Sequence, residues 1–409
     1  MRVLIYGINY WPELTGVGKY TAEMGQWLSD CRHDIRIVTA PPYYPQWRVA
    51  PGYANRYKCE ILDRQVIYRC PIWIPQKLHV LNRITHLLSF LFSSAPVILW
   101  QALRWRPTMI ITIQPPLITA PVAYTAARIA GAKTWMHIQD YELDTAFGLG
   151  MMTRPWLKAA LQGFERFFMR RFDRVSTISN RMMEQLSRKG VRDGRAVFFK
   201  NWVDTQYIFP LTGPSPFRAS LSISSEDVVA LYSGNMGRKQ GLEMLLDAAR
   251  SLAHEPHIKF VLAGEGSMRS ALEKLALGMK NVSFLPLQPV ERLNDLLNMS
   301  DIHLLLQRPQ TSDFLMPSKL TGMLASGRPI VATVHLDSEL AKTIEGCSIV
   351  VPPEDSKALA AAILELAGNS AKRRLLGQRG RSIAVSLFDK QTVLQEFENQ
   401  LCASGLQPS

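Results

Sequence analysis

Short apolar runs alternate with longer amphipathic stretches along nearly the whole chain, and this alternation limits the possible folds most strongly. In the first half, the runs that read as strands are 2–7, 34–39, 65–70, 109–114, 134–138 and 174–179. In the second half they are 228–233, 259–264, 282–285, 302–307, 330–333 and 348–351. Strands that alternate with helices form parallel sheets covered by helices, so the sequence predicts an α/β fold of the doubly wound type.

The chain is too long for one hydrophobic core. Its 409 residues indicate two domains, and the polar stretch 210–227 interrupts the series of strands. We therefore expect two Rossmann-like units, an N-terminal domain over 1–204 and a C-terminal domain over 205–385. Ligands of such sheets bind beyond the carboxyl ends of the strands, and two facing units would make a cleft.

Basic residues are concentrated in the first half of the chain. Residues 1–200 hold 27 Lys and Arg against 13 Asp and Glu, whereas the remainder holds 20 against 21. A general solubility charge would be spread over both halves. We therefore expect the N-terminal half to face something anionic, which leaves nucleic acid, a phospholipid surface and phosphorylated substrates as classes of partner.

Two stretches of the N-terminal half combine apolar and basic residues. Residues 77–107 are strongly apolar but broken by Ser, His and Pro, which falls short of a spanning helix of about 20 apolar residues. Residues 154–174 repeat aromatic residues at helical spacing with Lys and Arg between them. Such helices lie in a membrane interface or pack on the sheet. Both alternatives stay open for 77–107, and core packing is favoured for 154–174.

The cysteines do not form a recognisable framework. The five are scattered, at 31, 59, 70, 347 and 402, and no two have C-x-x-C spacing. We therefore expect neither disulfides nor a zinc site, and a reducing compartment. The N-terminus reads as a core strand rather than a signal peptide, which predicts a cytoplasmic protein.

The first glycine-containing loop, residues 8–20, raises the question of dinucleotide binding. The NAD fingerprint needs G-x-G-x-x-G directly after the strand and an acid at the end of the second strand. Here Gly16 and Gly18 come nine and eleven residues after Gly7, Thr21 takes the third position, and 37–41 contain no acid. NAD binding is therefore excluded. Close approach of the loop to a phosphate and a plain turn remain as alternatives.

A stronger phosphate signal lies at 231–249, where a strand, a glycine-rich turn and an amphipathic helix follow one another. Gly234 and Asn235 lie in the turn, with Arg238 and Lys239 beside them. Flexible glycines next to two cations suit a diphosphate. The alternative is that the two cations are simply solvated and bind no ligand. The spacing is not that of a P-loop ATPase.

Two further segments carry candidate polar residues. In 313–333, Ser318 is a natural N-cap of a helix whose exposed amides would bind an anion. In 135–144, His137 would donate to a substrate hydroxyl and Asp140 would orient an acceptor, although a histidine at a strand end is often structural. The chain has no Asp-x-Asp, so we expect no metal-bound diphosphate.

Longer stretches of the sequence resemble one family. The loop of Gly16 and Gly18, NWVD at 201–204, SGNMG at 233–237, AGEGS at 263–267 and PSKLTGMLASGRP at 317–329 resemble GT-B glycosyltransferases of the large retaining family 4. Within that family, the stretches YGINYWPELTGVGKYTAEM, TAPPYYPQW and HIQDYELD resemble the colanic-acid exopolysaccharide branch.

The resemblance implies two facing Rossmann-like domains, with the nucleotide sugar in the C-terminal one and the acceptor in the N-terminal one. It implies that a C-terminal helix within 386–409 crosses back to the first domain. It also implies retention of configuration without a metal or other cofactor. The catalytic residues it implies are His137, near the transferred sugar, and Arg238 and Lys239, at the donor diphosphate. The implied donor-binding residues are Gly16, Gly18, Gly234, Asn235, Gly264, Leu285, Pro286, Asp313, Ser318 and Lys319, and the implied acceptor-binding residues are Tyr43, Trp47 and Asp140.

The chain departs from the family pattern in the donor site. Many relatives carry a glutamate that contacts the ribose, and Gly322 stands at its place, with Asp313 near the place of its partner. Many relatives also have lysine directly before the glycine matching Gly241, where this chain has Gln240.

The branch suggests GDP-fucose as the donor, and a UDP-sugar is the rival. The implied acceptor is a polyprenyl-diphosphate-linked glycan in the anionic cytoplasmic leaflet, which the enzyme would reach as a peripheral membrane protein. A nucleic-acid-binding protein and a sugar-nucleotide epimerase are more distant alternatives, and we expect no nucleic acid as partner.

Overall fold

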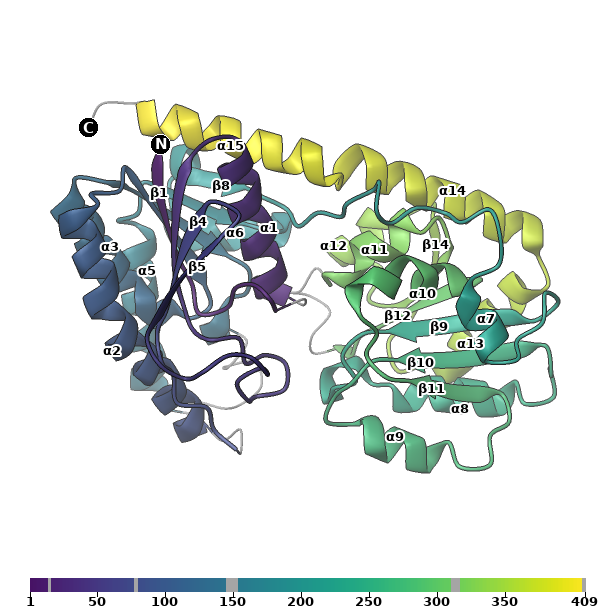
Figure 1. Ribbon diagram of the computed structural model, residues 1–409. Helices are drawn as coiled ribbons and strands as arrows, with labels where there is room; N and C mark the ends of the chain where they lie inside the picture. The colour runs from purple at the N-terminus through teal and green to yellow at the C-terminus, as the bar shows by residue number, and fades with distance from the viewer. Residues whose placement is uncertain (14–15, 77–79, 145–153, 310–316, 407–409) are drawn as a thin grey trace. The chain divides into compact units, whose positions relative to one another are not determined.

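The computed structural model describes residues 1–13, 16–76, 80–144, 154–309 and 317–406, and its chain forms two compact units (Figure 1). Unit 1 comprises Met1–Lys200 and Leu394–Ser409, and unit 2 comprises Asn201–Val393. The first division lies four residues before the expected boundary at 204/205, because Val203 N donates to the Phe388 carbonyl oxygen at 2.8 Å inside unit 2. The second division, between Val393 and Leu394, lies eight residues after the expected boundary at 385/386.

Unit 1 is built on an eight-stranded sheet in the order β3-β4-β2-β1-β5-β6-β7-β8. Its strands are β1 (Arg2–Tyr6), β2 (Asp34–Thr39), β3 (Lys58–Leu62), β4 (Gln65–Arg69), β5 (Met109–Gln114), β6 (Lys133–Ile138), β7 (Arg174–Thr177) and β8 (Ala196–Phe198). Its helices are α1 (Gly16–Asp30), α2 (Val80–Arg104), α3 (Ala120–Ala130), α5 (Pro155–Met169), α6 (Asn180–Arg188) and most of α15 (Lys390–Leu406).

The sheet of unit 1 is mixed, whereas the sequence pattern predicts a parallel one. β3 pairs with β4 antiparallel, and the other strand pairs are parallel. Asp63 and Arg64 join β3 to β4 with φ values of 44° and 67°. Two successive residues of positive φ are typical of a tight hairpin turn. Here neither residue is glycine, so the usual hairpin signal is missing from the sequence.

Helices cover both faces of this sheet. On one face, side chains of α2, α3 and α6, such as Phe90, Ala123 and Leu186, share a core with the strands. On the other face, the ring of Phe397 from α15 lies 5.1 Å from the ring of Trp135 in β6 and stacks on Phe199 at 4.1 Å. The C-terminal helix therefore completes the core of unit 1.

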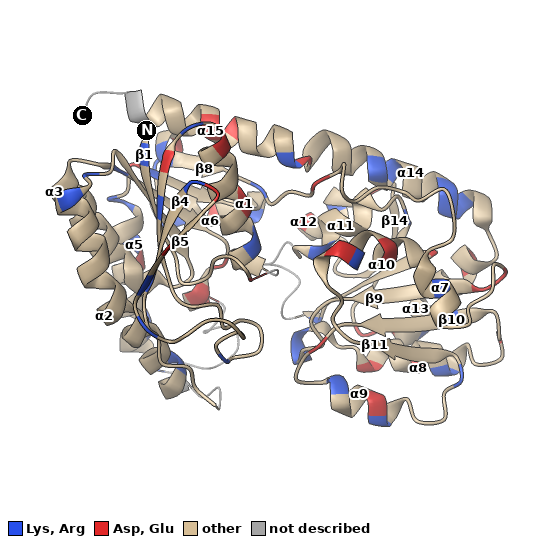
Figure 2. Ribbon diagram, viewed as in Figure 1, with Lys and Arg blue, Asp and Glu red and all other residues tan. Residues whose placement is uncertain are grey.

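Helix α2 presents an apolar face to the outside of unit 1. Phe90 and Ile98 are buried in the core, whereas Leu81, Phe92 and Leu103 are 76%, 70% and 61% exposed. The exposed residues are eleven positions apart, which places them on one side of a helix. Among the described residues, one helix, over 81–104, is long and apolar enough to cross a membrane by length and composition, and 33% of its apolar window is buried. Figure 2 shows α2 and α3 as almost uncharged.

Unit 2 is built on a six-stranded parallel sheet in the order β11-β10-β9-β12-β13-β14. Its strands are β9 (Val228–Ser233), β10 (Ile258–Ala263), β11 (Val282–Leu285), β12 (Ile302–Leu306), β13 (Ile330–Thr333) and β14 (Ser348–Val351). Its helices are α7 (Pro216–Ser220), α8 (Glu243–Ser251), α9 (Arg269–Leu275), α10 (Leu293–Met299), α11 (Lys319–Ala325), α12 (Glu339–Thr343), α13 (Ser356–Ala367) and α14 (Ser370–Leu387).

The central strands of unit 2 are apolar on both sides because both faces are covered. Every residue of β9 is buried, with Ala230 and Tyr232 in one core and Val229 and Leu231 in another. This pattern is typical of a parallel sheet between two helical layers. The polar stretch 210–227 belongs to unit 2 rather than to a passage between domains, and the Arg218 guanidinium pairs with Asp301 at 2.9 Å.

Candidate active site

In unit 2 the order of the strands indicates where a ligand binds. β9 and β12 are neighbours in the sheet, but the chain continues from β9 to β10 on one side and from β12 to β13 on the other. Such a switch point opens a crevice at the carboxyl edge of doubly wound sheets, and ligands bind there. The two loops meet at this edge, where Arg308 N after β12 donates to the carbonyl oxygen of Lys239 after β9 at 3.1 Å.

The loops that follow β9 and β10 are held together by their backbones. A Cβ atom on Gly264 would lie 2.0 Å from the Gly234 carbonyl oxygen, and one on Gly266 would lie 2.4 Å from the Met236 carbonyl oxygen. Gly264 also has a φ of 142°, which residues with side chains rarely adopt. Met236 N donates to the Glu265 carbonyl oxygen at 2.8 Å. Gly234 and Gly264 are thus brought together, and loop packing requires Gly264.

Leu285 and Pro286, the residues predicted to border the base, lie at the same edge. Gly264 N donates to the Leu285 carbonyl oxygen at 3.0 Å at the end of β11. The Arg269 guanidinium fastens this contact by donating to the carbonyl oxygens of Gly264 at 2.7 Å and Leu285 at 3.3 Å. Pro286 is exposed beyond the strand end.

Lys319, the first residue of α11, places a cation beside the glycine-rich loop. Its Nζ atom is buried and has no hydrogen-bond partner in the part of the chain that the structure describes. It lies over the Tyr232 ring, 4.0 Å from the centroid, and 4.0 Å from where a Cβ atom on Gly234 would be. Burial lowers the pKa of this amine to about 7, because desolvation disfavours the charged form. An anion beside Gly234 would supply the missing partner.

Arg238 and Lys239 form a single 3₁₀ turn, Arg238–Gln240, between β9 and α8. Arg238 is exposed and Lys239 is partly buried. Asn235 is exposed in the same loop, and its carbonyl oxygen accepts the Tyr232 hydroxyl at 2.6 Å. The structure thus gathers these three predicted residues at the edge that holds Lys319. Their contact with a diphosphate stays a prediction.

Ser318 does not cap α11 in the expected way. It stands at the N-cap position and is exposed, but its side chain makes no capping hydrogen bond, and its backbone is helical with φ −58° and ψ −24°. An N-cap side chain reaches the first turn from an extended backbone, which explains the difference. The anion-binding signal of this segment therefore rests on Lys319. Asp313 lies outside the described residues.

In unit 1 the structure places His137 at the end of β6, within the core. The side chain is buried, its Nδ1 atom lies 2.8 Å from the Ser176 hydroxyl, and its Nε2 atom lies 2.8 Å from the Gln139 amide nitrogen. The Phe199 ring packs 4.8 Å from the imidazole. Burial lowers the pKa of His137 to about 3, so it is a neutral core histidine. Its predicted place near the transferred sugar stays a prediction.

The loop of Gly16 and Gly18 is organised by Glu13, which the sequence interpretation missed. The buried Glu13 carboxylate accepts the backbone N–H groups of Tyr43 and Tyr44, both at 2.9 Å, and burial raises its pKa. A Cβ atom on Gly18 would lie 2.8 Å from the Glu13 Cβ, so Gly18 is needed for this packing, and its contact with the donor stays a prediction. Gly16, with a φ of 59°, faces open space. Glu13 is the sole acid of residues 8–20, which is its signal in the sequence.

The two aromatic residues predicted to bind the acceptor differ in exposure. Tyr43 is buried, and its hydroxyl lies 3.1 Å from His86 Nε2, so Tyr43 is a core residue, and its contact with an acceptor stays a prediction. Trp47 is partly exposed and packs on the His86 ring at 5.2 Å. The neighbouring Tyr44 and Trp11 are 39% and 43% exposed. They follow β2 and β1, at the carboxyl edge of the sheet.

Asp140 lines a small pocket beyond the ends of β5 and β6. Three acidic residues line it, Asp140, Glu142 and Glu165, together with Tyr141. Glu165 is paired with the buried Lys189 ammonium, whereas Glu142 has Arg83 at 3.9 Å. Burial raises the pKa of the Glu142 carboxyl. The pocket has room for about one water molecule, so it does not enclose a sugar ring.

Both halves of the chain match known families. Residues 15–202 match the glycosyl transferase 4-like domain, and residues 227–369 match the glycosyl transferases group 1 family. The chain is 40% identical to the WcaI protein of Escherichia coli (strain K12), which is named as a glycosyl transferase of colanic acid biosynthesis. The similarity covers 98% of this chain and 100% of the relative.

Solved structures share the fold. The sucrose-phosphate synthase tll1590 of Thermosynechococcus elongatus superposes with a TM-score of 0.77 at 17% identity, over 98% of this chain and 99% of that one. The Anabaena protein Alr3699/HepE in complex with UDP-glucose superposes with a TM-score of 0.70 at 16% identity, over 98% and 100%. The two Rossmann-like units are therefore those of the GT-B fold, as the sequence predicts.

Proposed function

The chain belongs to the glycosyltransferases that join a 4-like domain to a group 1 domain, and on that premise we propose that it transfers a sugar from a nucleoside diphosphate to a lipid-linked glycan. One observation carries the proposal. Lys319 holds a buried amine without a hydrogen-bond partner among the described residues, at the switch point of the unit 2 sheet. An uncompensated cation at this position suits the diphosphate of the donor.

The proposed chemistry is departure of the diphosphate with retention of configuration at the anomeric carbon. Negative charge grows on the diphosphate as its bond to the sugar breaks, and cations must stabilise it. Lys319 would meet this charge from the buried side, and Arg238 and Lys239 would meet it from the loop after β9. No metal is assigned a role, and no residue is assigned as a covalent nucleophile.

For the donor we propose GDP-fucose. Support comes from the sequence stretches that resemble the colanic-acid branch and from the 40% identity to a relative named for colanic acid biosynthesis. A UDP-sugar is the alternative, because Gly322 stands where many relatives have a ribose-binding glutamate and because HepE is a structural neighbour solved with UDP-glucose.

We propose that the acceptor glycan binds at the carboxyl edge of the unit 1 sheet. The partly exposed Asp140 carboxyl group would accept a hydrogen bond from one of its hydroxyl groups, and the exposed rings of Trp11 and Tyr44 would stack on sugar faces. Asp140→Asn tests this assignment. It should lower transfer about a hundredfold and leave the affinity for nucleoside diphosphate unchanged.

The matched control is Glu184→Gln, which removes an exposed acid of α6 in the same unit. Transfer should be unchanged in this variant. Full transfer activity in Asp140→Asn would remove Asp140 from the acceptor site.

An acceptor with a polyprenyl diphosphate would bring the enzyme to the cytoplasmic membrane surface. We propose that α2 docks there through its exposed face, with Leu81, Phe92 and Leu103 entering the interface. Arg104 and Arg106, both exposed at its C-terminal end, would contact lipid phosphates. Peripheral binding fits α2 better than spanning, because Phe90 and Ile98 are buried in the core of unit 1.

The donor is tested by ligand-observed binding of GDP, UDP and NADH to the full chain at equal concentrations without metal. Binding of GDP alone supports GDP-fucose and directs the transfer assay to it. Binding of UDP alone keeps the glycosyltransferase chemistry and overturns the proposed donor. Binding of NADH without either diphosphate contradicts the proposed site.

A further inference from the structure

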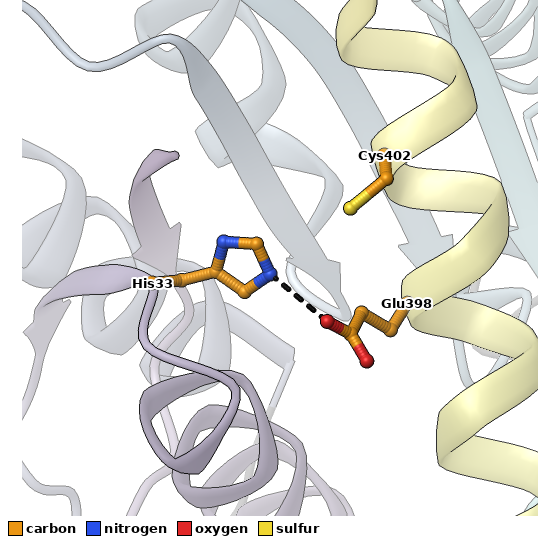
Figure 3. A group of neighbouring side chains, drawn as sticks. All are labelled: His33, Glu398 and Cys402. Atoms are coloured by element: carbon orange, nitrogen blue, oxygen red, sulfur yellow. Dashed lines mark hydrogen bonds and ion pairs between the residues drawn. The ribbon is translucent and has the colours of Figure 1, made fainter.

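The turn between α1 and β2 meets the C-terminal helix at a cluster of potential metal ligands (Figure 3). His33 comes from the turn, and Glu398 and Cys402 come from successive turns of α15. One ligand atom from each of these three residues lies within 4.8 Å of the others. All three belong to unit 1. None of them has a part in the proposed sugar transfer.

Hydrogen bonds already direct these groups toward one carboxylate. His33 Nε2 lies 3.3 Å from one oxygen of Glu398, and the thiol of Cys31 donates to the other oxygen at 3.2 Å. Arg32, with a φ of 64°, separates the two residues. Cys31 is not one of the three residues within the 4.8 Å group, but its thiol reaches the same carboxylate and is the candidate for a fourth donor. In each of these two hydrogen bonds a proton lies between the ligand atom and the Glu398 carboxylate. A bound cation would take the place of that proton.

The set of donor atoms is one that zinc prefers. Zn²⁺ binds Cys sulfur, His nitrogen and carboxylate oxygen at about 2.0 to 2.3 Å, and structural sites are four-coordinate and tetrahedral. Bonds of that length separate the ligands by roughly 3.3 to 3.8 Å, so the 4.8 Å limit requires only small side-chain movements of His33, Glu398 and Cys402. The Cys31 side chain, outside that group, must turn further to join them. The spacing of Glu398 and Cys402, four residues apart, puts both side chains on one face of α15.

Groups of both charges lie next to the cluster. Asp30, the last residue of α1, directly precedes Cys31, and the Glu398 carboxylate lies within the cluster. The main-chain nitrogen of Met1, 3.1 Å from His33 Nδ1, is a neighbouring positive group.

We propose that Cys31, His33, Glu398 and Cys402 bind one Zn²⁺, which fastens α15 to the turn after α1. The sequence spacing gave no sign of it, because the ligands come from two segments more than 360 residues apart. The ion would tie the returning helix to the sheet that it covers.

The test uses the untagged full chain, freed of metal by a chelator and kept reduced. Zinc is added from a buffered solution, and bound metal is counted after desalting. Co²⁺ replaces zinc in a second titration, because thiolate ligation gives a near-ultraviolet charge-transfer band and tetrahedral geometry gives strong visible bands. We expect one equivalent of zinc and both spectral features. A cobalt spectrum without thiolate charge transfer would overturn the proposal.

Alkylation of the cysteines provides an internal control in the same protein. Bound zinc should slow the reaction of Cys31 and Cys402 with iodoacetamide and leave the exposed Cys59 unchanged. Protection of Cys59 to the same degree would contradict the assignment. Unprotected Cys31 and Cys402 in the presence of zinc would contradict it as well. So would mild oxidation that joins Cys31 to Cys402 in the presence of saturating zinc, because the pair would then be a redox pair.

Substitutions identify the ligands. Cys402→Ser and His33→Gln should each weaken zinc binding about a hundredfold or more, because even residues that only support a ligand matter by ten- to a hundredfold. Cys59→Ser is the matched control and should bind zinc as the unmodified chain does. Circular dichroism confirms that each variant is folded. Unchanged affinity in Cys402→Ser would overturn the site.

Discussion

The ammonium nitrogen of Lys319 lies 4.0 Å from the centroid of the Tyr232 ring, at the carboxyl end of β9. A cation over an aromatic face gains about 0.5 to 2 kcal/mol, which is less than the cost of removing an ammonium from water. The described residues offer this nitrogen no hydrogen-bond acceptor. The free protein therefore keeps an unfavourable group at the place where we propose that the donor diphosphate binds.

Lys319→Met should stabilise the free protein. The pKa of Lys319 is about 7 in the folded chain and 10.5 in the unfolded one. Below pH 7 the lowered pKa reduces the free energy of unfolding by its full amount, and this reduction disappears as the pH rises to 10.5. The shift corresponds to an upper limit of roughly 5 kcal/mol, so we expect a gain of at least about 1 kcal/mol near neutral pH.

Urea unfolding measures this gain. The control is Lys274→Met, which removes an exposed lysine of α9 in the same unit and should leave the free energy of unfolding unchanged. A Lys319→Met variant less stable than the unmodified protein would contradict the burial argument.

The affinity for nucleoside diphosphate should fall as the pH rises above 7. Only the protonated Lys319 amine pairs with the diphosphate, and its pKa in the free protein is about 7. Above that pH, binding must take up a proton, so the affinity decreases by up to about tenfold per pH unit. Calorimetric titrations between about pH 7 and pH 9 measure the slope. A slope that persists in Lys319→Met would assign the titration to another group.

Gly264→Ala should disrupt the loop pair of the donor site. The new Cβ atom would lie 2.0 Å from the Gly234 carbonyl oxygen, in a backbone conformation that alanine rarely adopts. We expect a loss of more than about 2 kcal/mol of stability together with the loss of diphosphate binding. Gly278→Ala is the control, because Gly278 also has a positive φ, of 84°, but has nothing within 4 Å of its Cβ position.

Gly278→Ala should cost only the backbone strain, about 1 kcal/mol, and should bind diphosphate normally. Thermal unfolding and titration of both variants make the comparison. Equal effects of the two substitutions would mean that the contact between the loops does not matter.

The exposed face of α2 should govern membrane binding. Phe92→Gln combined with Leu103→Gln removes two apolar side chains that are 70% and 61% exposed. Because each fully buried side chain contributes about 1.5 to 3 kcal/mol, vesicle binding should weaken at least tenfold. Leu277→Gln, which changes an 80% exposed leucine of unit 2, is the control.

Co-sedimentation with vesicles that contain anionic lipid, at low and high salt, tests the proposal. Binding of the unmodified chain should decrease with salt because arginines contribute to it. Binding that is indifferent to both the substitutions and the salt would exclude docking through α2.

The strands of both units were predictable because their signals are local. Each predicted strand coincides with an observed one to within two residues at either end. The two that were missed, β3 and β8, lack such a signal. β3 is antiparallel, and the turn that joins it to β4 consists of Asp63 and Arg64 rather than a glycine pair. β8 has three residues, too few for an apolar run or an alternation of apolar and polar residues to be recognised.

Part of the candidate site could be predicted from residue types that have one structural use. Gly264 lies against the Gly234 backbone, and such a close approach needs glycine. The burial of His137 and Tyr43 could not be predicted, because the sequence does not show which polar side chains the fold encloses. Lys319 was predicted only through the backbone amides at the start of its helix. The position of its side chain over the Tyr232 ring depends on the packing of α11 on the sheet.

The most direct test of the donor site is calorimetric titration of GDP and UDP, without metal, into the unmodified chain, Lys319→Met and Lys274→Met. The proposed site predicts that the unmodified chain and Lys274→Met bind one of the two diphosphates equally well. It predicts that Lys319→Met binds it about a hundredfold more weakly, because a buried charge pair contributes roughly 2 to 5 kcal/mol. Equal affinity in Lys319→Met, or no binding of either diphosphate to the unmodified chain, would contradict it.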